Sequence, residues 1–273
     1  MQIDLKNLII KERGEIMLQD ERLEAIVQYL HVNERVDIET ICEMNHVSKD
    51  TARRDLILLE EAKKVIRIRG GAKRAQLSNE VYNFDERAEM ALKAKNEIGK
   101  LAATLIRDGD HLILDASTTV LALTKYLTSQ NHNIVTNSMD VANELLVREN
   151  IRINLLGGTL SKNHRAIYGS RAMKDIQDYK VNKCFIGTCG ISETGLSTSI
   201  EEEGLLNREM VKCADTVIVL VDSTKFNKTF FQKVCGLEDI DIVITEKEIP
   251  KNMLELLEKH NIQVIAAPDE LGR

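Results

Sequence analysis

The chain has 273 residues, of which 43% are hydrophobic and 29% are charged. This is the composition of a folded globular protein, and it excludes the disordered, collagen-like and disulfide-stapled classes. The formal net charge is −6, yet residues 49–74 carry nine Lys and Arg against four Asp and Glu, a charge asymmetry typical of a nucleic-acid-binding module joined to an acidic domain.

The first sixteen residues precede the first clear helical pattern. The codons of Arg13, Gly14 and Glu15 are compatible with a purine-rich ribosome-binding sequence a few nucleotides before Met17. We therefore expect 1–16 to be a non-native extension and translation to start at Met17, which the intact mass of the native protein would show. A short helical extension is the alternative.

Two helical patterns follow this segment. Apolar residues recur at helical spacing from Leu23 to Leu30, which predicts a helix over 20–32 with Asp20 as its N-cap. Asp37 is expected to cap a second, short helix that ends at a tight turn.

Ser48 is the expected N-cap of a third helix, whose Ala52, Leu56 and Leu59 face inward. Two helices joined by a short turn form a helix-turn-helix unit, and the start of its second helix enters the DNA major groove. The residues that we expect to contact DNA from this helix are Ser48, Lys49, Thr51, Arg53 and Arg54.

An alternating strand over 65–69 and a Gly-Gly turn then predict a two-stranded wing with a basic edge. The wing residues expected to contact DNA are Arg67, Arg69, Gly70, Gly71 and Lys73. Residues 17–75 are thus interpreted as a winged helix-turn-helix domain. A plain interaction domain with a solvated basic face is the alternative.

The segment VSKDTARRDLILLE at 47–60, followed by RIRGGA at 67–72, resembles the DNA-binding signature of the DeoR/GlpR family of bacterial transcriptional regulators. The family usually has Ile where Ala52 stands and His where Arg69 stands. The resemblance extends over nearly all of residues 17–265, and it implies a transcriptional regulator, most often a repressor, that binds double-stranded operator DNA.

Residues 76–93 lack a strong period and are expected to be a linker. From 94 to 268, helical and apolar β-branched segments alternate, which predicts an α/β domain with a mainly parallel sheet covered by helices. The expected helices are 94–107, 120–127, 139–148, 201–214 and 251–260. The expected strands are 112–114, 134–135, 153–156, 184–186, 217–221, 242–244 and 263–265.

Small, hydroxylated or charged residues follow five of these strands. Since the carboxyl ends of parallel strands form the ligand-binding edge of open α/β sheets, these residues together favour a binding site, although any one such loop is often only a turn. We expect a phosphate at the helix N-terminus of 117–119, Lys225 to neutralise it, and Asp115, Asn137 and Glu203 to bind hydroxyls. The candidate effector-binding residues are Asp115, Ser117, Thr118, Thr119, Thr136, Asn137, Gly157, Gly158, Gly190, Glu203 and Lys225.

These strand-end motifs also resemble the sensor domain of the DeoR/GlpR family, which is similar to the ribose-5-phosphate isomerase and glucosamine-6-phosphate deaminase folds. The resemblance implies a homo-oligomer that regulates carbohydrate-metabolism genes in response to a phosphorylated sugar. Gly204, Asn207 and Asn227 depart from the usual family residues.

The alternative function is a sugar-phosphate isomerase or deaminase with a fused DNA-binding head. Catalysis needs a positioned general base, and no His stands in the strand-end motifs, while His164 lies in a loop that we expect to be exposed. We therefore expect no catalytic residues. The five cysteines contain no C-x-x-C pair and no apolar run is long enough to span a membrane, so we expect a cytoplasmic protein without metal, cofactor or membrane partner.

Overall fold

The computed structural model describes residues 17–33, 35–62, 64–74 and 82–267. The chain divides into two compact units, Met1–Leu77 and Ser78–Arg273. Residues 1–16, with the expected extension, and 76–81 of the expected linker lie outside the described part of the chain. None of the described helices is long and apolar enough to cross a membrane.

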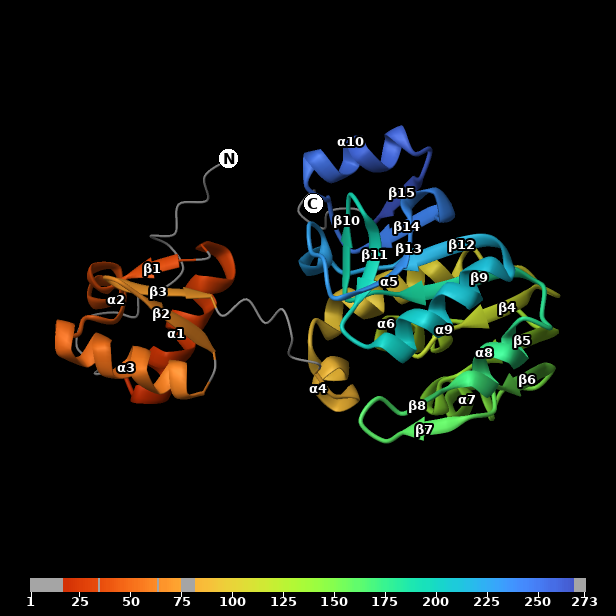
Figure 1. Ribbon diagram of the computed structural model, residues 1–273, viewed down its shortest axis with the longest axis horizontal. Coiled ribbons are helices and arrows are strands. Elements are labelled where there is room, and N and C mark those ends of the chain that lie inside the picture. Colours follow the sequence, from red (N-terminus) through yellow and green to blue (C-terminus); the bar gives the residue numbers. More distant parts are fainter. Residues whose placement is uncertain (1–16, 34, 63, 75–81, 268–273) are drawn as a thin grey trace. The chain divides into compact units, whose positions relative to one another are not determined.

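The described part of the first unit has three helices and a three-stranded antiparallel sheet of order β1-β3-β2 (Figure 1). The helices are α1 (Gln19–Asn33), α2 (Ile38–Asn45) and α3 (Lys49–Glu61). The strands are β1 (Arg35–Asp37), β2 (Val65–Ile68) and β3 (Gly71–Arg74). All three expected helices and the wing are confirmed.

Two of the three expected helix caps are confirmed. The Asp37 carboxylate accepts a hydrogen bond from the Thr40 amide at 2.7 Å, and the Ser48 hydroxyl accepts one from the Thr51 amide at 3.3 Å. The prediction for Asp20 was wrong, because α1 begins one residue earlier and Asp20 lies in its first turn. The Glu21 carboxylate instead accepts the Leu18 amide, at 3.0 Å.

An aliphatic core joins these elements. Ile26, Ile41, Leu56, Leu59 and Val65 are all at most 2% exposed, which fixes α3 against α1, α2 and the wing. Burial of each such side chain stabilises the folded state by roughly 1.5–3 kcal/mol.

The second unit is built on a seven-stranded parallel sheet of order β15-β14-β12-β9-β4-β5-β6. Its strands are β4 (His111–Leu114), β5 (His132–Thr136), β6 (Ile151–Leu155), β9 (Val181–Gly187), β12 (Ala214–Leu220), β14 (Ile242–Thr245) and β15 (Gln263–Ala266). The expected parallel α/β sheet is confirmed, with each expected strand in place.

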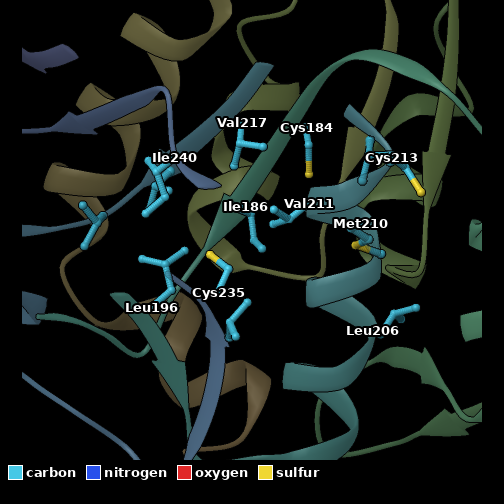
Figure 2. Close-up of a cluster of buried hydrophobic side chains, with 14 of the residues drawn as sticks. Cys184, Ile186, Leu196, Leu206, Met210, Val211, Cys213, Val217, Cys235 and Ile240 are labelled. Carbon is cyan, nitrogen blue, oxygen red and sulfur yellow. The ribbon is translucent and has the colours of Figure 1, made fainter. Parts of the chain in front are cut away.

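Helices cover both faces of this sheet (Figure 1). They are α5 (Leu92–Ala103), α6 (Thr118–Thr124), α7 (Met139–Leu145), α8 (Ser170–Ile176), α9 (Glu201–Lys212) and α10 (Lys251–Lys259), while α4 (Phe84–Glu89) packs against α6. Successive residues of a strand point to opposite faces, so Ile113 joins one core and Leu112 and Leu114 join the other. Figure 2 shows the core on the α9 side, where Cys184, Val217 and Met210 meet.

Six short strands were not predicted from the sequence. One is β1, which adds a third strand to the expected two-stranded wing. The other five are the hairpin β7 (Thr159–Ser161) and β8 (Ala166–Tyr168), and the small sheet of β10 (Gly190–Ser192), β11 (Gly195–Thr198) and β13 (Gln232–Cys235). The described part of the expected linker is not an irregular segment. It contains the helix α4, whose Phe84 is only 4% exposed.

Candidate functional site

The start of α3 presents a basic, exposed surface. Arg53 and Arg54 are both exposed. Arg53 pairs with Asp50 at 3.3 Å, and Lys49 pairs with Glu39 at 2.6 Å. Exposed ion pairs of this kind contribute little stability, so these cations remain available to a polyanion.

The position of α3 is fixed by an ion pair that the sequence analysis did not identify. Arg22 of α1 donates from Nε and Nη2 to the two carboxylate oxygens of Asp55, at 2.8 and 3.0 Å, and Asp55 is 1% exposed. A two-point contact between planar groups fixes orientation as well as distance. It holds the buried face of α3, while Arg53 and Arg54 stay exposed.

The wing places Arg67 and Arg69 in solvent. The Arg67 amide donates to the Glu60 carboxylate at 3.2 Å, while Lys73 is half-buried on β3. Position 71 requires glycine for a structural reason, because a Cβ there would lie 2.0 Å from the carbonyl oxygen of Val36. Gly70 adopts φ +88° at the turn, a conformation that favours glycine.

In the second unit, the sheet order reverses between β4 and β9, because the chain proceeds from β4 to β6 in one direction and from β9 to β15 in the other. Ligands of open α/β sheets bind in the crevice at such a switch point. Asp115 follows β4 and Gly187 ends β9, and the Gly187 amide donates to the Asp115 carboxylate at 2.9 Å. A Cβ at Gly187 would lie 2.1 Å from Ser117 Oγ, so glycine is required there.

Asp115 is 1% exposed, and burial raises its pKa to about 7, with Glu203 raising it further and the amides of Ser117 and Gly187 opposing the shift. Glu203, on α9, accepts a hydrogen bond from Thr198 Oγ1 at 3.0 Å. The structure therefore brings two of the predicted acidic residues into one electrostatic environment at the switch point.

This pKa predicts a pH-dependent stability. Because the native Asp115 keeps its proton up to about pH 7, whereas an unfolded Asp releases it near pH 3.9, its stabilising contribution is complete below pH 4 and is lost as pH rises through 7. We expect the free energy of unfolding to fall by about 1 kcal/mol per pH unit between pH 5 and 7 relative to Asp115→Asn. Urea titrations of both proteins at pH 5, 6, 7 and 8 measure it, and parallel pH profiles would contradict the assignment.

The hydroxyls expected to bind phosphate have structural partners. Ser117 Oγ accepts the amides of Thr119 and Val120, at 3.1 and 3.4 Å, and thereby caps α6. Thr118 and Thr119 are 8% and 6% exposed. Two of the backbone amides at the helix end that was expected to bind an anion therefore already donate to the cap residue.

The remaining strand-end residues form the turns around this crevice. Thr136 Oγ1 accepts the Ser138 amide at 3.0 Å. Gly158 and Gly190 lie against backbone, where a Cβ would come within 2.4 and 2.5 Å of carbonyl oxygens. Gly157 lies at the end of edge strand β6, two strands from the switch point.

Asn137 is one of the predicted residues with capacity left for a ligand. Its Nδ2 donates to the Ile167 carbonyl at 3.2 Å, while its buried Oδ1 accepts from no described residue. Buried polar atoms normally have partners, so this oxygen is a candidate acceptor for a ligand hydroxyl.

Two cations near the crevice were missed as site residues. Lys95 of α5 is 6% exposed and donates to the Arg87 carbonyl. Burial lowers its pKa to about 8, Asp222 acts to raise it, and Lys225 lowers it further. The side chain of Arg87 has a buried Nε with no partner in the described chain, and its charge acts on Asp115.

His164 also differs from the expectation of an exposed loop residue. It is half-buried in the β7–β8 connection, and its Nδ1 is buried with no partner among the described residues. Burial and the Arg87 charge lower its pKa, which keeps the ring neutral near pH 7 and able to accept or donate a hydrogen bond.

Comparison with protein families decides what kind of protein carries these two surfaces. Residues 22–77 match the model of the DeoR-like helix-turn-helix domain, and residues 90–247 match that of the DeoR C terminal sensor domain. The chain belongs to the DeoR family. It is a DNA-binding transcriptional regulator, as the resemblance in its sequence implies.

Relatives of this DeoR-family protein match nearly their whole length. It is 40% identical over 257 residues to the HTH-type transcriptional repressor GlcR of Bacillus subtilis (strain 168), covering 94% of this chain and 100% of that one. It is 29% identical to the glycerol-3-phosphate regulon repressor of Escherichia coli (strain K12), covering 91% and 99%. The solved ribose 5-phosphate isomerase A of Methanocaldococcus jannaschii is similar in fold over 48% of this chain and 53% of that one, with 18% identity and a TM-score of 0.36.

Proposed function

We propose that this protein represses carbohydrate-metabolism genes and that a phosphorylated sugar, bound but not transformed, controls its hold on operator DNA. The observation that carries the proposal is the group of cations and carboxylates at the β4–β9 switch point, in a chain that also carries a capped, basic helix-turn-helix. The names of the two relatives, one a repressor of a glycerol-3-phosphate regulon, support it.

DNA binding is assigned to the first unit. The start of α3 would lie in the major groove, where Arg53 and Arg54 read base edges and Ser48, Lys49 and Thr51 contact phosphates. Arg67, Arg69 and Lys73 of the wing would contact the backbone on either side of the Gly70-Gly71 turn. Each phosphate contact makes the affinity more dependent on salt.

The effector site is assigned to the switch point. Arg87, Lys95 and Lys225 would bind the phosphate. The charges of Arg87 and Lys225 both act against that of Lys95, and an anionic ligand would relieve this repulsion through charge-assisted contacts. Asp115, Glu203 and Asn137 would bind sugar hydroxyls. Carboxylates that only hold hydroxyls bind the sugar without a reaction at its carbon atoms.

Binding would reach the DNA-binding unit through α4. The nearby cavity lined by Ala88, Lys95 and Thr118 holds about 60 Å³, whereas ligand sites are usually 300–1,000 Å³. A sugar phosphate would therefore displace α4, the first described helix after the segment joining the two units. A ligand shifts an equilibrium only by binding the two arrangements differently, and displacement of α4 supplies that difference.

Arg165 holds α4 in place. Its guanidinium lies 5.0 Å from the centre of the Phe84 ring and bridges Asp85 of α4 and Asp140 of α7, at 2.7 and 3.2 Å. The Phe84 amide also donates to the Asn163 carbonyl at 2.8 Å. These contacts join α4 to the β7–β8 hairpin beside the site.

We expect Arg165→Ala to bind effector at least as tightly as the wild type, because displacing α4 no longer breaks the Arg165 contacts. It should nevertheless lose most of the effector-induced change in operator affinity, because α4 is no longer held in one arrangement. Isothermal titration and fluorescence anisotropy measure the two quantities. Lys180→Ala, which removes an exposed ion pair with Asp215, is the matched control and should respond normally.

The proposed function is tested by selecting an operator from random duplexes and then adding hexose phosphates, the matching free sugars and inorganic phosphate. A phosphorylated sugar should change operator affinity and raise the melting temperature of the full chain, and it should be recovered unchanged. Failure of the chain to select any duplex would contradict the DNA-binding assignment. Conversion of the sugar phosphate to product would favour the isomerase or deaminase alternative.

A further inference from the structure

Strand β6 forms one edge of the seven-stranded sheet. It pairs with β5 on one side, and no strand of the described chain pairs with its other side. The Leu156 amide donates to the Thr136 carbonyl of β5. Since backbone groups alternate in direction along a strand, Ile151, Ile153 and Leu155 direct their N–H and C=O groups to the open edge.

Exposed apolar side chains occur on β6 and on the elements next to it in the chain. Leu155 is 41% exposed, and Leu146 and Val147, which follow α7 and precede β6, are 72% and 84% exposed. Met139 at the start of α7 and Leu160 of β7 are also exposed. An open strand edge with exposed apolar side chains is a template for pairing with another strand.

The β6 sequence is complementary to itself in the antiparallel direction. With Ile153 on a two-fold axis, Ile153 faces Ile153 of the second copy and Ile151 faces its Leu155, so apolar residues meet on one face. Arg152, the charged residue of the strand, faces Asn154 of the second copy, so no like charges oppose each other. The outward backbone groups of Ile151, Ile153 and Leu155 all find partners in this register.

We propose that two copies of this chain associate through antiparallel pairing of β6 with β6, which joins their sheets into one fourteen-stranded sheet. A symmetric contact of this kind uses the same patch on both subunits. It would present two DNA-binding units to the two halves of a pseudo-palindromic operator. The contact does not depend on the effector.

Cysteine cross-linking in the full chain tests the register. In a hydrogen-bonded antiparallel pair the facing Cα atoms are about 5.5 Å apart, which suits a disulfide. Ile153→Cys should therefore form a covalent dimer under mild oxidation. Arg152→Cys is the matched control, because residues 152 of the two copies are offset by two positions and too far apart to join.

Sedimentation of the wild type and of Leu155→Lys, an exposed position whose change should spare the fold, provides a second measurement. We expect the wild type to be a dimer or a multiple of it, and the variant to dissociate at least tenfold more readily, with circular dichroism showing that it stays folded. A monomeric wild type would overturn the proposal. So would an oligomer in which Ile153→Cys cross-links no better than Arg152→Cys, or one that Leu155→Lys leaves intact.

Discussion

Replacing Arg54 with Ala is expected to weaken operator binding by about 1–3 kcal/mol, roughly 5- to 150-fold, and to relax the preference at one base pair. Arg54 is exposed near the start of α3, and no described residue bonds to its guanidinium. Nothing holds it away from a guanine edge, where a forked contact discriminates between bases. Arg53→Ala should also weaken binding, although its pairing with Asp50 must first be given up.

Fluorescence anisotropy with the selected operator and with base-substituted versions measures both effects. Arg107→Ala removes one exposed positive charge from the second unit and should leave affinity and base preference unchanged. Unchanged affinity in both Arg53→Ala and Arg54→Ala would exclude α3 as the reading helix. An equal loss of affinity for all the operator sequences would instead indicate that these arginines contact phosphates.

The DNA-binding unit was predictable because its signals are local. Asp37 and Ser48 each cap a helix through an amide three residues away. The spacing of apolar residues within α3 indicates which face of the helix is buried. The Asp55 carboxylate shows the limit of this reasoning. Its partner Arg22 lies 33 residues earlier, and no local pattern predicts that the two meet.

The sheet was predictable for a related reason, since buried parallel strands are continuous apolar runs. The missed strands are three or four residues long, and β7, β11 and β13 carry Ser, Thr, Lys or Gln, which are also common in loops. Some of their pairing also depends on neighbours distant in sequence: β11 pairs with β13 through Leu196 and Cys235.

The candidate effector residues predicted from the sequence lie at the carboxyl edge of the sheet, but the structure gives several of them structural roles. Hydroxyls such as Ser117 Oγ suggested an anion site, and the structure uses that oxygen to cap α6. Arg87 and Lys95 lie in and beside a stretch that has the composition of a linker, so only the packing of α4 and α5 shows that their charges reach the crevice.

Lys95→Met and Lys225→Ala are each expected to abolish most of the response to a phosphorylated sugar while leaving operator binding intact. Lys95 is buried, and Met fills a similar volume without a charge to desolvate, so the free protein should melt at the same temperature or higher. The affinity for the effector should fall at least tenfold, because a buried cation makes a strong charge-assisted hydrogen bond with phosphate. Lys180→Ala serves again as the control.

The pH dependence of effector binding separates a phosphate-binding role of Lys95 from a structural one. With its pKa at about 8 in the free protein, Lys95 is mostly charged at pH 7 and mostly neutral at pH 9. A bound phosphate favours the charged form, so binding takes up a proton and affinity falls as pH rises through 8, by about tenfold at pH 9. Isothermal titration at pH 7, 8 and 9 should show this fall in the wild type and a much flatter profile in Lys95→Met. If both proteins lose affinity in parallel, the titrating group lies elsewhere, and Lys95 only supports the carbonyl of Arg87.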